Sequence, residues 1–262
     1  MKIAVIGGGN MGGAIVRGLI KSGYLMSDSI TVSDINETTL DRLVEHAPGI
    51  NVTYNNIEAC SGADYIVIAV KPWFLLDVIS QIRPHLDYSK QSILSVAAGV
   101  SCSELSDMLK LDGVSPNIFR IVPNTAIAVN QSMIFISTVN GSDKAIQEVS
   151  DIFSQLGKIS IIEERLVSAA TSIGSCGTAF AFRYIRANIA AGIELGLSSE
   201  TAKEVVLQTL KGTVELLEKG GEHPEMEIDK VTTPGGLTIR GLNELEHNGF
   251  SSAIVKGYKA TH

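Results

Sequence analysis

The sequence KIAVIGGGNMGG, residues 2–13, decides the fold of this 262-residue chain. Its apolar start, Lys2–Ile6, predicts a strand, and the amphipathic run Met11–Lys21 predicts a helix. The turn between them has the Gly-x-Gly-x-x-Gly spacing of loops that bind a dinucleotide pyrophosphate, with its glycines at Gly7, Gly9 and Gly12. The first glycine makes the tight turn, the second lets the backbone approach the phosphates, and the third lets helix pack on strand. The alternative is a glycine turn in a sheet protein that binds no nucleotide.

The first part of the chain alternates β-rich and helical runs. Further strands are expected at Ile30–Ser33, Tyr65–Val70, Ile93–Ala97, Asn117–Ile121, Met133–Ser137 and Lys158–Ile162. Helices are expected at Thr38–Glu45, Ser103–Leu109 and Ser142–Leu156. Strands that alternate with helices indicate βαβ units and a parallel sheet. Residues 1–162 are therefore predicted to form an α/β, dinucleotide-binding domain.

Residues 163–262 are predicted to form a second, all-helical domain. Helices are expected at Glu163–Thr171, Thr178–Leu195, Ser199–Lys219 and Thr238–His247, with no strand between them. The Thr178–Leu195 helix is apolar nearly all round, so it should lie between other helices, including those of a second subunit.

The composition argues against several classes of protein. Hydrophobic residues make up 45% of the chain and charged residues 19%, which is too apolar for a disordered protein. The net charge of −7, without a basic cluster, argues against nucleic-acid binding. The cysteines form no C-x-x-C pair, which argues against a disulfide framework and a zinc site. No apolar run is long enough for a membrane span, and a strand beginning at Lys2 leaves no room for a signal peptide. We expect a cytoplasmic protein without a metal.

Asp34 ends the second predicted strand, 22 residues after Gly12. An acidic residue at this place usually accepts hydrogen bonds from the adenosine ribose and repels a 2′-phosphate. The nearest following arginine is Arg42, about two helical turns further on. By charge alone the site favours NADH. The alternative is that Asp34 or Asn36 only caps the next helix.

Two later strands also end in residues suited to a ligand. Lys71-Pro72 follows the Tyr65–Val70 strand, and the small residues Ala97-Ala98-Gly99 end the next strand, where they leave space for a flat ring. Ligands of doubly wound sheets lie at such carboxyl ends. Both segments are equally compatible with ordinary loops.

TTPGGLT, residues 232–238, precedes a predicted helix. Gly235 and Gly236 are expected to expose N–H groups that bind a carboxylate, and Thr238 adds a hydroxyl in the first helical turn. A helix-start loop with a capping threonine is an equal alternative. The sequence presents no nucleophile–His–acid trio and no metal-ligand cluster.

Seven segments carry a resemblance to a known family. They are IGGGNMGGAI at 6–15, AVKP at 69–72, SVAAGV at 95–100, RIVPNTA at 120–126, GEHPE at 221–225, DKVTTPGGLTIRGLNELE at 229–246 and NGF at 248–250. Together they resemble pyrroline-5-carboxylate reductase along nearly the whole chain. The resemblance implies a Rossmann-type doubly wound sheet followed by an all-helical dimerisation domain, in a homodimer that can assemble into a larger ring. It further implies reduction of 1-pyrroline-5-carboxylate to L-proline with NADPH or NADH.

The resemblance also assigns residues to the site. It places the pyrophosphate on Gly7, Gly9, Asn10, Met11 and Gly12, and the adenosine near Ser33, Asp34 and Asn56. It places the nicotinamide by Ala69, Val70, Lys71, Pro72, Ala97 and Ala98. The substrate carboxylate is implied to lie on Thr233, Gly235, Gly236 and Leu237 of the partner subunit, with Thr238 as the hydrogen-bond donor near the ring nitrogen.

The chain departs from the family pattern in its helical part. Thr178 stands where a proline is usual, and Arg186 reverses the usual charge of its position. These departures leave open a non-catalytic paralogue, or one that reduces another cyclic imine. A β-hydroxyacid dehydrogenase is a further alternative. Its chemistry uses a lysine after a Gly-x-x-Gly turn, and no lysine occurs between Lys158 and Lys203.

Overall fold

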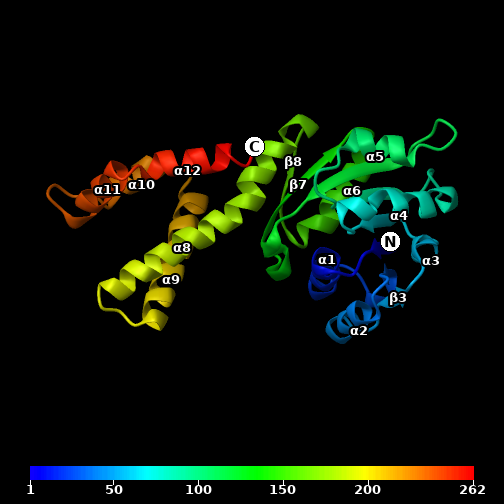
Figure 1. The fold of residues 1–262 in the computed structure, drawn as a ribbon, viewed down its shortest axis with the longest axis horizontal. Coiled ribbons are helices and arrows are strands. Elements are labelled where there is room, and N and C mark those ends of the chain that lie inside the picture. The colour runs from blue at the N-terminus through cyan, green and yellow to red at the C-terminus, as the bar shows by residue number, and fades with distance from the viewer. The chain divides into compact units, whose positions relative to one another are not determined.

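The computed structural model describes residues 1–262. The chain divides into two compact units, Met1–Ser175 and Cys176–His262. The first unit contains the sheet and the second is entirely helical (Figure 1). None of the helices combines the length and the apolar character needed to cross a membrane.

The first unit is built on one eight-stranded sheet with the order β3-β2-β1-β4-β5-β6-β7-β8. The strands are β1 (Ile3–Ile6), β2 (Ile30–Ser33), β3 (Asn51–Thr53), β4 (Tyr65–Ile68), β5 (Ser92–Ser95), β6 (Asn117–Val122), β7 (Ser132–Thr138) and β8 (Gly157–Ile161). All neighbours are parallel except β6 and β7. The order reverses at β1, so the carboxyl ends of β1 and β4 flank the crevice where doubly wound sheets bind ligands.

Helices cover both faces of this sheet (Figure 1). One face packs against α1 (Asn10–Lys21), α2 (Glu37–His46) and α6 (Asp143–Ser154), and the other against α3 (Asn56–Cys60), α4 (Leu75–Ile82) and α5 (Cys102–Leu109). Successive residues of a strand point to opposite faces, so Ile3 and Val5 join the first core while Ala4 and Ile6 join the second. Burial on both faces explains why these strands are continuously apolar.

The strands and helices predicted for this unit are confirmed, with ends displaced by one or two residues. Three elements were not predicted: β3, α3 and α4. The predicted helix Glu163–Thr171 is only partly right. It begins as a 3₁₀ turn at Glu164–Leu166, becomes α7 (Val167–Thr171) and continues as a π-helix at Ser172–Cys176.

The segment 163–175 belongs to the first unit because it packs against β7. Asn124 Nδ2 donates to the Gly174 carbonyl at 2.7 Å. A Cβ added at Gly174 would lie 2.5 Å from the ring of Phe135, a residue of β7, so the backbone approaches this ring closely. The two compact units therefore divide further along the chain than the domain boundary expected after residue 162.

The second unit consists of five helices. They are α8 (Gly177–Glu194), α9 (Ser199–Gly220), α10 (Pro224–Lys230), α11 (Leu237–His247) and α12 (Phe250–Lys259). Of these, α10 and α12 were not predicted. Gly196, with φ +99°, lies two residues after the end of α8, where the chain turns toward α9. The Ser198 hydroxyl accepts the Thr201 N–H and so caps the start of α9. The rings of Phe180 and Tyr258 join α8 to α12 at a centroid distance of 4.9 Å.

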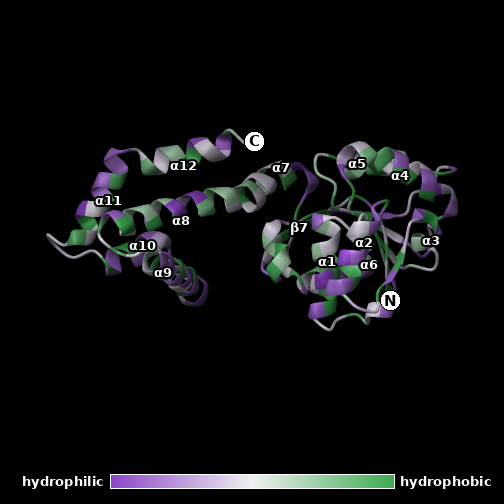
Figure 2. Cartoon of the chain, turned by 60° about the horizontal axis from the view of Figure 1, so that its bottom comes forward, coloured by the Kyte–Doolittle hydropathy of each residue, from purple (hydrophilic) through white to green (hydrophobic).

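The second unit leaves many apolar side chains uncovered. Gly177 and Ala202 are its only fully buried residues. On α8, Phe182 is 64% exposed and Ile193 45% exposed, so the burial predicted for this helix is not reached within one chain. Apolar residues recur along its helices in Figure 2. Extensive exposed apolar surface is typical of a region that another subunit covers.

Candidate active site

The glycine turn after β1 has the geometry that a pyrophosphate requires. Gly7 has φ +99°, and a Cβ there would lie 2.8 Å from the Ala69 carbonyl oxygen. A Cβ at Gly12 would lie 1.9 Å from the Gly7 carbonyl oxygen, so only glycine fits. At Gly9 a Cβ would meet nothing within 4 Å, so this backbone is open to a ligand. Asn10 and Met11 then begin α1 without a side-chain cap, which leaves the first N–H groups to a bound anion.

The Asp34 carboxylate lies beside this turn. Its Oδ2 accepts the Gly8 N–H at 2.8 Å and its Oδ1 accepts the Asn36 N–H at 2.9 Å. The cap of α2 is Asn36, whose Oδ1 accepts the Thr39 N–H at 3.2 Å. The capping alternative is therefore right for Asn36 and wrong for Asp34. The Asp34 carboxylate instead places a negative charge at the end of β2.

Ser33 and Asn56, predicted together near the adenosine, do meet. The buried Ser33 hydroxyl donates to Asn56 Oδ1 at 2.8 Å, and Asn56 Nδ2 donates to Gln81 Oε1 at 3.0 Å. This chain of hydrogen bonds joins β2, α3 and α4 at the carboxyl edge of the sheet.

The segments predicted to hold the nicotinamide follow the neighbouring strands β4 and β5. Ala69 continues β4 by donating its N–H to the Ile6 carbonyl at 2.8 Å, Val70 is half-buried, and exposed Lys71 precedes Pro72, which starts a 3₁₀ turn. Ala97 is buried and its N–H donates to Ser95 Oγ at 3.3 Å, whereas Ala98 is exposed. Since β1, β4 and β5 are adjacent and parallel, both segments line the same edge as the glycine turn.

The TTPGGLT loop, in the second unit, differs from expectation in one respect. The Gly236 N–H, expected to bind a carboxylate, donates instead to the Thr233 carbonyl at 2.9 Å. Gly235 has φ +69° in this turn. Gly236 caps α11 without any side-chain hydrogen bond, so the capping-threonine alternative is wrong as well. The first helical residues, Leu237 and Thr238, are both exposed, and their N–H groups have no acceptor within the helix.

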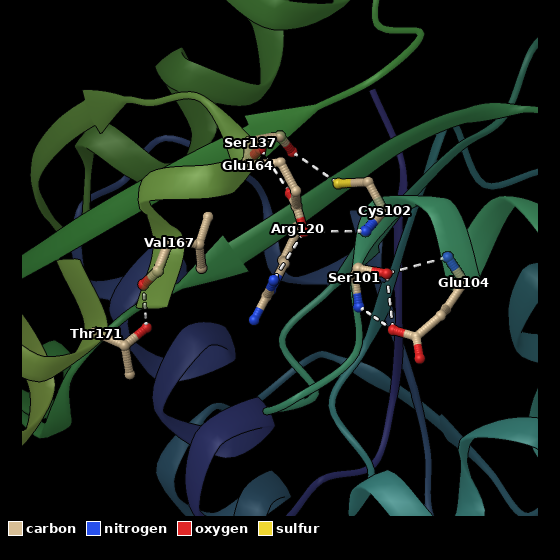
Figure 3. Close-up of polar contacts among 8 residues, drawn as sticks. All are labelled: Ser101, Cys102, Glu104, Arg120, Ser137, Glu164, Val167 and Thr171. Atoms are coloured by element: carbon tan, nitrogen blue, oxygen red, sulfur yellow. Dashed lines mark hydrogen bonds and ion pairs between the residues drawn. The ribbon is translucent and has the colours of Figure 1, made fainter. Parts of the chain in front are cut away.

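A polar cluster that sequence reasoning missed surrounds Glu164 (Figure 3). Its carboxylate accepts hydrogen bonds from Arg120 Nη1 at 2.7 Å, Ser137 Oγ at 2.7 Å and the Cys102 N–H at 3.2 Å. Burial alone would raise the pKa of Glu164, but the bonds from Ser137, Arg120 and Cys102 outweigh it and hold the pKa below its ordinary value. These residues come from α5, β6, β7 and the turn after β8, so no local motif connects them.

Burial raises the pKa of the Cys102 thiol to about 12, with a smaller contribution from Glu164. Cys102 is therefore an inert neutral thiol. The structure brings no three His, Cys, Asp or Glu side chains together in a group that could hold a metal ion.

Comparison with known proteins finds relatives over the full length. The family model described as NADP oxidoreductase coenzyme F420-dependent matches residues 2–99, and that described as pyrroline-5-carboxylate reductase dimerisation matches residues 164–262. Pyrroline-5-carboxylate reductase 2 of Dictyostelium discoideum is 38% identical over 97% of this chain and 89% of its own. The crystal structure of the Plasmodium falciparum pyrroline carboxylate reductase with NADP bound has a TM-score of 0.87 at 30% identity, over 100% of this chain and 95% of that one. The Coxiella burnetii pyrroline-5-carboxylate reductase has a TM-score of 0.91 at 27% identity, over 99% and 95%.

The doubly wound sheet and its glycine turn thus define an oxidoreductase that uses NAD(P)H. With relatives at this identity over nearly its whole length, the chain belongs to the pyrroline-5-carboxylate reductase family. Its helical part is of the family's dimerisation type, so the protein is a homo-oligomer.

Proposed function

We propose that this chain catalyses the NAD(P)H-dependent reduction of 1-pyrroline-5-carboxylate to L-proline, a reaction at a C=N bond. The observation that carries the proposal is that α1 and α11 each begin after a glycine without a side-chain cap, so both leave helix-start N–H groups available to an anion. The first suits the pyrophosphate of a dinucleotide, and the second suits the carboxylate of a small substrate.

In the proposed cofactor site the chain provides a cradle for each part of the dinucleotide. The pyrophosphate lies on Gly7, Gly9, Asn10, Met11 and Gly12, and the adenosine lies near Ser33, Asp34 and Asn56. The nicotinamide lies beside Ala69, Val70, Lys71, Pro72, Ala97 and Ala98. When bound, the nicotinamide supplies the hydride. The small side chains of Ala97 and Ala98 leave room for its flat ring.

In the proposed substrate site the chain supplies positioning rather than an acid. Reduction of a cyclic imine needs a hydride at carbon and a proton at nitrogen. A substrate that binds as its iminium already carries that proton, so no strong acid is required. In agreement, TTPGGLT contains neither a carboxylate nor a histidine. The rate then depends mainly on how well the site holds the imine carbon against the nicotinamide.

Each residue of the loop has a role in this proposal. The helix-start N–H groups of Leu237 and Thr238 bind the substrate carboxylate, with the Thr233 hydroxyl beside them. Gly235 and Gly236 shape the turn that presents these groups. An iminium nitrogen has no free lone pair, so its N–H donates to the Thr238 hydroxyl rather than accepting from it.

The test is an assay of the purified protein with each cofactor. We expect oxidation of NADH or NADPH that depends on 1-pyrroline-5-carboxylate. A six-membered cyclic imine carboxylate and a β-hydroxyacid with oxidised cofactor serve as comparison substrates. Dinucleotide binding without any turnover would favour the non-catalytic paralogue, and faster turnover of a comparison substrate would favour an altered substrate.

We further propose that residues 1–162 form the dinucleotide-binding domain and that residues 163–262 form the substrate-binding and dimerisation domain, whose first segment, 163–175, packs on the sheet unit. The chain would form a homodimer that assembles into a ring. The support is the exposed apolar surface of α8 to α12. Sedimentation is expected to give an even-numbered oligomer, and a monomer at micromolar concentration would contradict the dimer.

The proposed location is the cytoplasm, because the three cysteines are free thiols, as is usual in reducing compartments. The proposed partners are the small-molecule substrate and copies of this chain, not a nucleic acid or a membrane. The net charge of −7 supports the absence of a nucleic-acid partner. Microscopy of cells that produce the fluorescently labelled protein tests the location, and a DNA-binding assay tests the absence of a nucleic-acid partner.

A further inference from the structure

The Glu164 carboxylate is the centre of a hydrogen-bonded cluster that joins three elements of the sheet domain. It binds Arg120 of β6, Ser137 of β7 and the backbone N–H of Cys102 at the start of α5 (Figure 3). Register places Arg120 opposite Ser95 of β5 and Ser137 of β7, so the cluster lies beside the strand that leads to Ala97.

The bond from the Cys102 N–H to Glu164 lies at one end of the loop proposed to hold the nicotinamide. The near end of this loop is held by the sheet, because the Val96 N–H donates to the Ile68 carbonyl at 3.1 Å. At the far end, the capping box of Ser101 and Glu104 fixes the loop only to α5 itself. Cys102 follows directly, and its N–H donates to Glu164. This bond ties the far end to Glu164, and the Cys102 thiol also donates to the Ser137 carbonyl of β7 at 3.5 Å.

The loop between these two anchors is short and is exposed at its middle, whereas Ala97 is buried and Val100 and Ser101 are half-buried. Ala98 and Gly99 are both exposed, and Gly99 has φ +78°. A displacement of the start of α5 would therefore move Ala98 directly. Such a shift needs no change in the glycine turn, which follows β1.

The orientation of the Glu164 carboxylate is fixed by more than one hydrogen bond. Arg120 and Ser137 each contribute a bond of 2.7 Å from a different strand. Arg120 Nε is buried and has no hydrogen-bond partner, and the Arg120 guanidinium forms its ion pair with Glu164. Loss of the Glu164 charge would leave a largely buried cation unpaired, and its neighbours would rearrange.

We infer that Glu164 is a positioning residue for the nicotinamide half of the cofactor, acting through the Cys102 N–H on the loop Ala97–Ser101. The inference rests on the proposed function, since that function assigns the nicotinamide to this loop. It predicts that loss of the Glu164 carboxylate weakens the binding of the nicotinamide half of the dinucleotide more than the binding of the ADP-ribose half.

The experiment compares Glu164→Gln with the unaltered protein and with Glu163→Gln as the matched control. Glu163 is the preceding residue, and its partner is exposed Arg165 at 2.6 Å, outside the cluster. Isothermal titration measures the affinity for NADH and for ADP-ribose, which lacks the nicotinamide. Glu164→Gln is expected to weaken NADH binding about tenfold and ADP-ribose binding less than about twofold. Glu163→Gln should change neither.

Turnover provides a second readout. A misplaced nicotinamide should lower kcat while KM for the imine stays the same, because the substrate loop belongs to the other unit. Equal weakening of NADH and ADP-ribose would show a merely structural role and overturn the inference, as would Glu164→Gln behaving like its control. If Glu164→Gln does not fold, Ser137→Ala, which removes one donor and no charge, must show the same selective loss of NADH affinity.

Failure of the proposed function is distinguishable from failure of this inference. The affinity ratio requires no turnover, so an inactive protein with a selective NADH defect would refute only the reaction. Unaltered protein that binds NADH no better than ADP-ribose would refute the nicotinamide site and the inference with it.

Discussion

The Asp34 carboxylate accepts the backbone N–H of Gly8 at 2.8 Å, so the end of β2 is bonded to the glycine turn after β1. This contact fixes a negative charge close to where the adenosine ribose is proposed to lie. Glu37 adds a second carboxylate in the first turn of α2. A 2′-phosphate placed here would meet the Asp34 carboxylate.

We therefore predict that NADH binds at least as well as NADPH. Asp34→Asn, which removes the charge and keeps an acceptor for the Gly8 N–H, should lower the ratio of the NADPH KM to the NADH KM about tenfold. Asp28→Asn is the control, because Asp28 is exposed and precedes the amino end of β2. An unchanged ratio in Asp34→Asn would refute this role.

Alanine substitutions at two glycines of the turn should have different effects, one on stability and the other on dinucleotide affinity. Gly12→Ala puts a methyl group 1.9 Å from the Gly7 carbonyl oxygen and should cost roughly 1–3 kcal/mol of stability. Gly9→Ala meets nothing within 4 Å in the protein, and its φ of −64° suits alanine. It should melt like the unaltered protein and bind the dinucleotide about tenfold more weakly, or about 1.4 kcal/mol. Melting curves and titrations test both, and normal cofactor affinity in Gly9→Ala would contradict the assignment.

Thr238 should matter to turnover and not to cofactor binding. Loss of one hydrogen bond to the substrate in Thr238→Ala should cost roughly 1–3 kcal/mol, about ten- to a hundredfold in kcat/KM. Thr213→Ala is the control, since the Thr213 hydroxyl only donates to Thr209 within α9. Steady-state kinetics and NADH titration measure the two effects. Full activity in Thr238→Ala, or loss of NADH binding, would exclude the proposed role.

The free energy of unfolding should fall in acid, partly because Glu164 becomes protonated. Its pKa in the folded protein lies below the ordinary value of 4.5, so its ionised form stabilises the fold above that value. This stability is lost as pH falls from about 4.5 through the folded pKa. The free energy of unfolding should therefore differ between the unaltered protein and Glu164→Gln at pH 7, and the difference should shrink below about pH 4.5. Urea titrations at several pH values measure it. A difference that stays constant into acid would mean that Glu164 is not the group concerned.

The fold was largely predictable because buried parallel strands are apolar runs and the glycine turn has a fixed spacing. The helix α4 was also readable in principle, since Leu75, Val78, Ile79 and Ile82 recur at helical spacing on one buried face. In contrast, β3 is three residues long and mostly exposed, so it has no apolar pattern to detect.

From the residue pattern alone, the site was predictable where its geometry is local, whereas the meeting of Ser33 and Asn56 was implied only by the family resemblance. The demand on Gly12 arises within one turn, against the Gly7 carbonyl, whereas Arg120 and Glu164 are 44 residues apart and meet only through the order of the strands. The Gly236 N–H was misjudged because whether an N–H is free depends on the backbone turn, which its side chain does not reveal.

Transfer of a labelled hydride tests the central claim most directly. The protein is incubated with 1-pyrroline-5-carboxylate and with NADH or NADPH that carries deuterium on the transferred position of the nicotinamide, and the product is analysed by mass spectrometry and chiral chromatography. We predict L-proline with a single deuterium on the carbon that formed the C=N bond. Unlabelled proline, or no proline while the cofactor remains bound, would contradict the account.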